Sequence, residues 1–105
     1  MDDIGRIEAD AIRQTEVGNW PLARYLFLQT LTHEMPPLRH AYLERSVAQT
    51  YQREGNWREA EMWASMALET LGSVGVPSGG EEAQSLHEWL VSFIPDMTAR
   101  SGGVY

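Results

Sequence analysis

Cysteine and lysine are both absent from this chain of 105 residues. Without cysteine, the chain can have no disulfide framework, no thiolate zinc site and no thiol nucleophile. Without lysine, it can be neither a Schiff-base enzyme nor a protein with the usual phosphate-binding loop, whose lysine contacts the phosphates. Several enzyme classes are therefore excluded before any motif is considered.

Positive charge and long apolar runs are also scarce. Eight arginines stand against 15 acidic residues, which gives a formal net charge of −7 at pH 7. This balance argues against nucleic acids and anionic membranes as general partners. No apolar run approaches the ~20 residues that span a bilayer, and the first residues lack a basic segment followed by an apolar one. We therefore expect a cytoplasmic protein without nucleic-acid or membrane partners.

Apolar residues are numerous enough for one folded domain. They make up 43% of the chain and include four tryptophans, whereas charged residues make up only 22%. A single compact domain is the natural expectation for a folded chain of this length.

A repeated tripeptide organises the chain. Gly-Asn-Trp occupies residues 18–20 and recurs at residues 55–57, which is 37 positions later, and the chain contains no other asparagine. Small residues at matching positions would let two helices approach closely where they cross. Aligning the two tripeptides also pairs identical residues elsewhere, namely Ala11 with Ala48, Ala23 with Ala60, and Leu31 with Leu68.

Each copy is predicted to form a helix, a tight turn and a second helix. Gly18 and Gly55 suit the left-handed position that ends a helix. Asn19 and Asn56 suit the N-cap of the helix that follows. Glu59 lies three residues after Asn56, which is the spacing of a capping box.

Apolar residues at helical spacing predict five helices, and we find no strand pattern of useful length. Pro95 is expected to end the fifth helix, because proline breaks helix hydrogen bonding. The glycine-rich segment before that helix is expected to be a flexible connector. The predicted helices span about residues 4–17, 20–33, 38–54, 57–71 and 82–94.

The second copy resembles a tetratricopeptide repeat. Its pattern is Ala48-x-x-Tyr51-x-x-x-Gly55-Asn56-Trp57-x-x-Ala60, followed by Ala64, Ala67 and Leu68. The first copy is similar but weaker, and the period is 37 residues where the family has 34. The three additional residues are most simply placed in the loop at residues 33–37.

The resemblance implies an all-α fold, a short right-handed α-solenoid of about five antiparallel helices. Two helix hairpins would stack and share a core, and the fifth helix would cap the exposed end. The implied organisation is one domain at 1–98, comprising repeat one (about 4–34), repeat two (about 38–71), a flexible connector (72–81) and a capping helix (about 82–94), with a flexible tail at 99–105.

The resemblance also implies a binding site, because tetratricopeptide arrays hold peptides or proteins in a concave face lined by the first helix of each repeat. Arginine and glutamine there would suit a carboxylate or an extended backbone. A merely solvated polar face is the alternative interpretation. The groove positions of the second copy are Tyr42, Arg45, Gln49 and Gln52, with Arg53 beside them; those of the first are Glu8, Ile12 and Thr15, with Glu16 beside them.

The four tryptophans have two interpretations. Trp20 and Trp57 occupy the structural aromatic position of the repeat and are expected in the core. Trp63 and Trp89 would belong either to the core or to an interface with a partner, where tryptophan is enriched.

Metal and catalytic sites are not predicted. His33, Glu34 and His40 are close in sequence, but their spacing matches no usual zinc pattern. The chain has no nucleophile elbow, no phosphate loop and no glycine fingerprint opening a helix. We expect no cofactor, no metal and no enzymatic activity.

Three functions remain open. The first is a non-catalytic adaptor that binds a partner protein or peptide through the concave face, where Arg39, Arg45 and Arg53 would form a cationic strip. The second is a structural or assembly subunit, or a chaperone, that forms a homodimer or sits permanently in a larger complex. The third is a regulator that covers a basic surface, which the net charge of −7 would attract.

Overall fold

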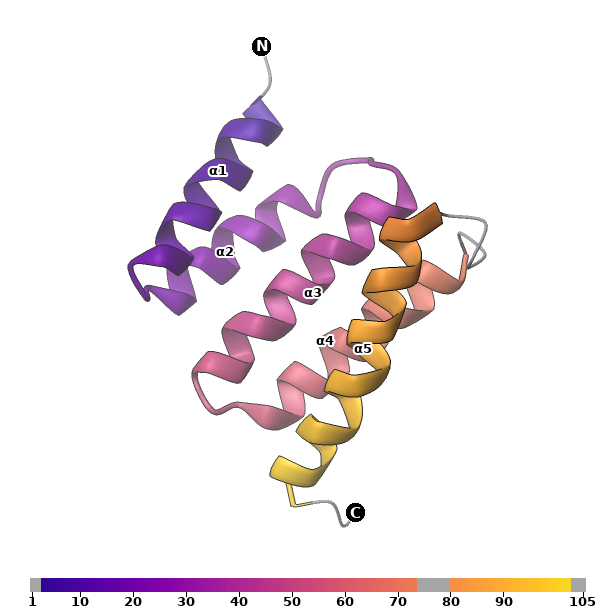
Figure 1. Ribbon diagram of the computed structural model, residues 1–105. Helices are drawn as coiled ribbons and strands as arrows, with labels where there is room; N and C mark the ends of the chain where they lie inside the picture. The colour runs from indigo at the N-terminus through magenta and orange to yellow at the C-terminus, as the bar shows by residue number, and fades with distance from the viewer. Residues whose placement is uncertain (1–2, 74–79, 103–105) are drawn as a thin grey trace.

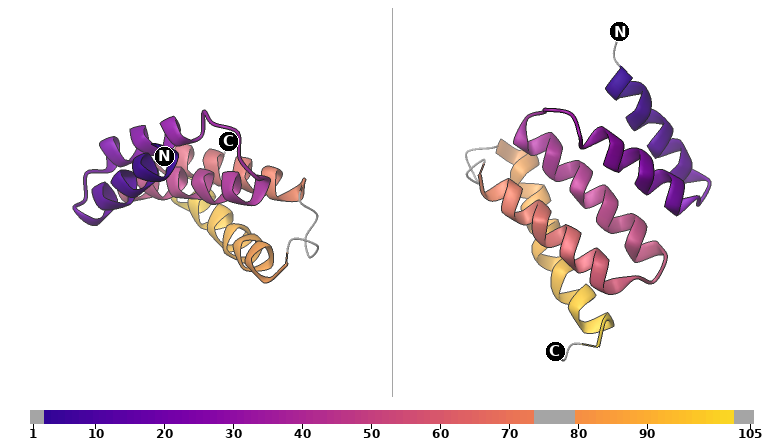
Figure 2. Two further views of the ribbon diagram at one scale, coloured as in Figure 1. Left: turned by 90° about the horizontal axis from the view of Figure 1, so that it is seen from above. Right: turned by 180° about the vertical axis from the view of Figure 1, so that it is seen from behind.

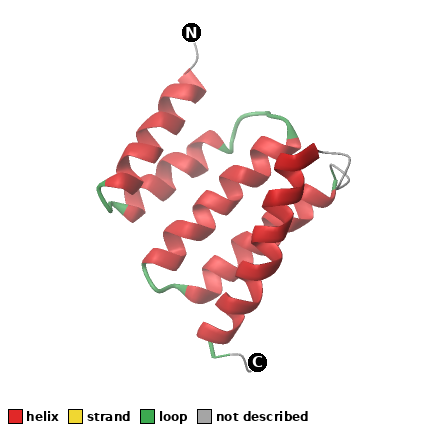
Figure 3. Ribbon diagram, in the orientation of Figure 1, coloured by secondary structure: helices red, strands yellow, loops and turns green. Residues whose placement is uncertain are grey.

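Helices are the only regular secondary structure in the part that the structure, a computed structural model, describes: residues 3–73 and 80–102. No strand occurs within those residues (Figure 3). The prediction of an all-α fold with five helices is confirmed. The helices are α1 (Asp3–Glu16), α2 (Trp20–Thr30), α3 (Pro37–Arg53), α4 (Trp57–Gly72) and α5 (Gly80–Arg100) (Figure 1).

Successive helices are neighbours in space. α1 packs on α2, α3 packs on α4, and α2 joins the two hairpins by packing on α3. α5 packs on α4 and also touches α3. Seen from above (Figure 2, left), α5 lies on one side of the layer that the other four helices form. No helix among the described residues is both long and apolar enough to cross a membrane.

The two hairpin turns have nearly identical backbones. Gly18 and Gly55 have φ angles of +78° and +77°, as predicted for the left-handed residue that ends a helix. In each turn, the N–H of the following asparagine donates to the carbonyl five residues earlier, at 2.9 Å. The repeated tripeptide therefore encodes a repeated backbone turn.

The two asparagines differ in their side chains. Asn19 accepts a hydrogen bond from the backbone N–H of Leu22 at 3.4 Å, as an N-cap does. Asn56 occupies the same position but makes no side-chain cap hydrogen bond. The predicted capping box with Glu59 is also wrong, because the backbone N–H of Asn56 that Glu59 would bind already donates to the carbonyl of Tyr51.

The turn predicts a clear effect for glycine substitution. Gly55→Ala should destabilise the protein by about 1–2 kcal/mol, because a β-carbon strains the left-handed backbone. Steric contact adds little, since the nearest atom to that carbon would lie 3.8 Å away on Trp57. Gly72→Ala is the matched control; it lies in helical backbone with open space around it and should be neutral or stabilising. Urea unfolding of both variants measures this, and equal effects would contradict it.

The core consists of two apolar clusters that meet at α3. The larger cluster joins α3, α4 and α5, and the smaller joins α1, α2 and α3. Half-buried Tyr51 and Trp63 contact both clusters, whereas Trp57 packs against the larger one. The small residues predicted at helix crossings are completely buried, namely Ala11, Ala23, Ala48 and Ala60.

The fifth helix is longer than predicted, and Pro95 lies inside it. An interior proline costs a helix about 3 kcal/mol, mainly by removing one hydrogen bond to the carbonyl four residues earlier. Here that carbonyl belongs to Val91, whose side chain is exposed like Pro95, so this strip of the helix faces water. Beyond the proline, Met97 is completely buried and the Thr98 hydroxyl donates to Glu61 of α4. These tertiary contacts offset the local cost.

The predicted boundaries around α5 change accordingly. The helix begins at Gly80 and ends at Arg100, so the first residues of the expected tail are helical. Gly72 belongs to α4, and Gly80 and Glu81 belong to α5 rather than to a connector. Residues 74–79 of the predicted connector and 103–105 of the predicted tail lie outside the described residues.

Candidate functional site

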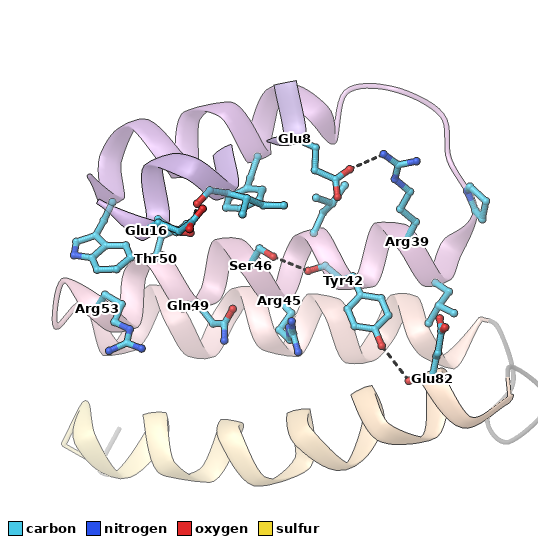
Figure 4. Close-up of a pocket in the computed structure, with 17 residues that line it drawn as sticks. Glu8, Glu16, Arg39, Tyr42, Arg45, Ser46, Gln49, Thr50, Arg53 and Glu82 are labelled. Carbon is cyan, nitrogen blue, oxygen red and sulfur yellow. Dashed lines mark hydrogen bonds and ion pairs between the residues drawn. The ribbon is translucent and has the colours of Figure 1, made fainter. Parts of the chain in front are cut away.

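A groove of about 910 Å³ lies between α1 and α3 (Figure 4). Four of the five predicted partner-binding residues line it, and so do all four of their first-copy counterparts. The lining residues are Glu8, Ile12, Thr15 and Glu16 of α1; Trp20 and Phe27 of α2; Pro36 before α3; Leu38, Arg39, Tyr42, Leu43, Arg45, Ser46, Gln49, Thr50 and Arg53 of α3; and Glu82 of α5.

The groove lies where α1 approaches α3 mainly through α2. α1 packs on α2, which in turn packs on α3. α1 reaches α3 through an ion pair of 2.5 Å between Glu8 and Arg39. Ile12 of α1 is left 48% exposed and lines the groove. Both walls therefore combine polar and apolar side chains, with Ile12 on the α1 side and Leu38, Tyr42 and Leu43 on the α3 side.

Four side chains of α3 form a row along the groove, which we call the α3 row: Tyr42, Arg45, Gln49 and Arg53. Figure 4 shows them in this order along the helix. Each is three or four residues from the next, so all share one helix face. Arg45 and Arg53 are eight residues apart, which is about 12 Å along the helix axis.

Gln52 was predicted in this set but does not line the groove. Successive side chains are rotated by about 100° around a helix axis. Gln52 therefore points beyond Arg45, which is at the edge of the α3 row, and about 100° away from Arg53. The side chain is half-buried outside the groove. The set of groove residues predicted from the sequence therefore contained one residue too many.

Arg45 is a half-buried cation between two aromatic rings. Its guanidinium carbon lies 5.2 Å from the ring centroids of both Tyr42 and Trp89, within the range of cation–π attraction. Burial lowers the pKa of Arg45, and neighbouring Tyr42 opposes that effect. The ordinary pKa of arginine is so high that the group remains charged at neutral pH. Its Nε atom is buried and has no hydrogen-bond partner.

Arg53 stands at the other end of the α3 row. It is exposed, and its guanidinium carbon lies 5.9 Å from the ring centroid of Trp20. Among the described residues, no carboxylate lies within ion-pair distance of Arg45 or Arg53. The groove therefore presents two cations whose charge no acidic side chain neutralises.

The other arginine predicted in a cationic strip is already paired. Arg39 binds Glu8, so its charge is neutralised across the groove. Glu16 and Glu82 also line the groove, on α1 and at the start of α5. The predicted strip is therefore wrong in its extent, because the lining is mixed in charge and its unpaired cations lie only on α3.

The tryptophans divide differently from the prediction. Trp20 was expected in the core but is half-buried and lines the groove beside Arg53. Trp63, a candidate interface residue, packs against both apolar clusters. Trp89 stacks on Phe93 at 4.5 Å between ring centroids and lies beneath Arg45. The repeat itself was the signal for Trp20, since stacked hairpins place the first turn beside the second, where Arg53 ends α3.

Three hydroxyl groups of the groove are occupied within their own helices, and that of Tyr42 donates to the backbone carbonyl of Glu82 in α5 at 3.4 Å. Thr15 donates to the carbonyl of Ile12, Ser46 to that of Tyr42 and Thr50 to that of Val47. None of these three is paired with a histidine or carboxylate base. Within the described residues, no three histidine or acidic side chains are grouped so that they could hold a metal ion. The groove thus offers guanidinium donors, an amide and aromatic faces, which are groups suited to binding.

Comparisons of the chain with protein-family models, with curated proteins and with solved structures find no match. Inferences about function therefore rest on the internal repeat and on the geometry of the groove.

Proposed function

We propose that the protein is a non-catalytic adaptor of tetratricopeptide-repeat type that binds a segment of a partner protein in the groove. The observation that carries this proposal is the pair of arginines, Arg45 and Arg53, that line the groove and have no carboxylate partner in the described part of the chain. Arginine is among the residues most enriched at binding hot spots.

Arg45 gives the strongest reason to expect a ligand. A buried polar atom without a hydrogen bond costs free energy, and a charged group costs more. The Nε of Arg45 is such an atom, and the aromatic rings beside it compensate only in part. A carboxylate entering the groove would supply an opposite charge and would accept from the outer guanidinium nitrogens of Arg45; a contact with Nε itself would require the side chain to shift, because that atom is buried.

The architecture supports the same proposal. Two hairpins with matching turns and matching buried alanines stack through α2 and α3. The groove is lined by the first helix of each hairpin, which is the surface that the family resemblance implies for partner binding. Both the repeat and the groove therefore favour an interaction module.

Charge reversal in the α3 row is the direct test. The double variant Arg45→Glu, Arg53→Glu should bind a partner, captured with the wild-type chain and then purified, about 1,000-fold more weakly, since hot-spot residues contribute about 2 kcal/mol each. The matched control is Arg6→Glu, Arg58→Glu, which changes the net charge equally at two exposed arginines outside the groove. Calorimetry gives the affinities and circular dichroism the helicity. Equal affinities of the two double variants would refute the proposal.

Self-assembly is the second candidate function. Met62 and Met66 lie one turn apart on α4 and are 49% and 37% exposed, so they offer apolar area to another protein. Homodimerisation or permanent residence in a larger complex, as a subunit or chaperone, would cover them. Light scattering across a range of concentrations distinguishes the candidates, because self-assembly requires a mass that rises with concentration.

A further inference from the structure

We infer that the ligand of the groove is an extended peptide segment with two acidic side chains at positions i and i+4, one bound by Arg45 and the other by Arg53. This inference rests on the proposed function and names the chemistry of the partner. Between the two acids, the side chain at i+2 would lie against Gln49.

The spacing of the α3 row supports this register. Arg45 and Arg53 are about 12 Å apart along the helix axis, and Gln49 lies midway, about 6 Å from each. In an extended chain, side chains at i, i+2 and i+4 point to the same face and lie about 7 Å and 13 Å from the first. The spacing of Arg45, Gln49 and Arg53 along α3 therefore matches the spacing of side chains on one face of an extended peptide. Acidic side chains at i and i+3 of such a peptide would point to opposite faces.

The length of the groove suits a short extended ligand. The groove runs along α3 from Leu38 to Arg53, which is about 22 Å at 1.5 Å per residue. An extended chain rises about 3.3 Å per residue, so about seven residues would span that length.

The charges of the groove limit the acids to one face of the ligand. Glu8 is already paired with Arg39, whereas Glu16 lines the α1 wall and makes no ion pair with any residue that the structure describes. A ligand with acids on both faces would place some of them against Glu16. The groove should therefore prefer alternating acidic and uncharged residues to a continuous acidic run.

The two arginines should contribute unequally. Arg45 is half-buried and its Nε is enclosed, so a carboxylate beside it is shielded from water. Arg53 is exposed, and an ion pair there is screened by solvent and salt. We expect loss of the Arg45 guanidinium to weaken binding more than loss of the Arg53 guanidinium.

Synthetic peptides test the register. Nine-residue peptides with blocked ends and an uncharged background would carry two glutamates at i,i+4, at i,i+3 or at i,i+8, with a two-glutamine peptide as the neutral reference. Binding is followed by calorimetry and by tryptophan fluorescence, since Trp20 and Trp89 lie against the two arginines. The i,i+4 peptide should bind about tenfold more tightly than the i,i+3 peptide, as expected for one charged contact.

Variants connect this preference to the α3 row. Arg53→Gln should abolish the advantage of the i,i+4 peptide over a peptide with a single glutamate, whereas Arg58→Gln should leave it unchanged. Glu16→Gln should strengthen binding of a peptide that has acids on both faces. Tighter binding of the i,i+8 peptide would indicate a helical ligand and would overturn the inference.

The failure of this inference can be told from failure of the proposed function. If all acidic peptides bind no better than the neutral one while the Arg45, Arg53 charge reversal still abolishes partner binding, the ligand chemistry is wrong and the groove remains the binding site. If the charge reversal leaves partner binding unchanged, the groove is not the binding site, and both proposals fall.

Discussion

Replacing Leu90 with alanine should lower the free energy of unfolding by about 2–5 kcal/mol. Leu90 is 0% exposed and belongs to the larger apolar cluster, where α5 packs against α3 and α4. Truncation removes its transfer free energy and leaves a cavity that the surrounding helices can close only in part. Urea unfolding followed by far-ultraviolet circular dichroism measures the change.

The adjacent residue provides the control for this prediction. Val91 lies on the same helix but is 44% exposed, so Val91→Ala should change stability by no more than about 0.5 kcal/mol. Equal losses for the two variants would contradict the docking of α5 into the core. The pair also separates the contribution of packing from any general sensitivity of α5 to truncation.

Replacing Phe27 with alanine should cost even more, about 3–5 kcal/mol, measured in the same way. Phe27 is only 4% exposed and is the largest buried side chain of the smaller cluster, which joins α1 and α2 to α3. It also lines the groove, so its removal should weaken the wall as well as the core. Tyr25→Ala on the same helix is the control, because that ring is 58% exposed and should contribute little.

The Phe27 substitution should also separate the two halves of the molecule. In a stack of hairpins, each unit is stabilised mainly by its neighbours, and a weakened terminal unit can unfold first. Hydrogen exchange should therefore lose protection in α1 and α2 before α3, α4 and α5. Simultaneous loss of protection in all five helices would show that the two clusters unfold as one unit.

Much of the fold could be predicted because the repeated residues are those that the turns and helix crossings require. The glycines of the two turns and the alanines of the helix crossings are short-range requirements, and they placed the first four helices within about one residue, except that α2 ends at Thr30 and not near residue 33. The end of α5 could not be predicted in this way. Pro95 gives a strong local signal to stop, whereas the burial of Met97 and the bond from Thr98 to Glu61 depend on where α4 lies.

The same distinction applies to the groove. Tyr42, Arg45, Gln49 and Arg53 share one helix face, so their common position follows from helical periodicity alone. Which arginines are free of partners does not follow from it. Arg39 pairs with Glu8, which is 31 positions away in the sequence. Arg45 lies over the ring of Trp89, which belongs to α5. Such contacts require the packing of α1 and α5 to be known.

The meeting of two apolar clusters at α3 has a consequence for ligand linkage. The groove lining includes Phe27 and Leu43 of the smaller cluster, together with Leu38 and Tyr42, which pack against the larger one. A ligand that contacts both sets would therefore link one half of the molecule to the other. A ligand present at 100 times its dissociation constant adds about 2.7 kcal/mol to the stability of the state that binds it. Saturation should therefore raise the melting temperature of the Phe27→Ala variant and bring the unfolding of its two halves together. In this fold, ligand binding in the groove and the stability of the contact between the two halves of the molecule would be thermodynamically linked.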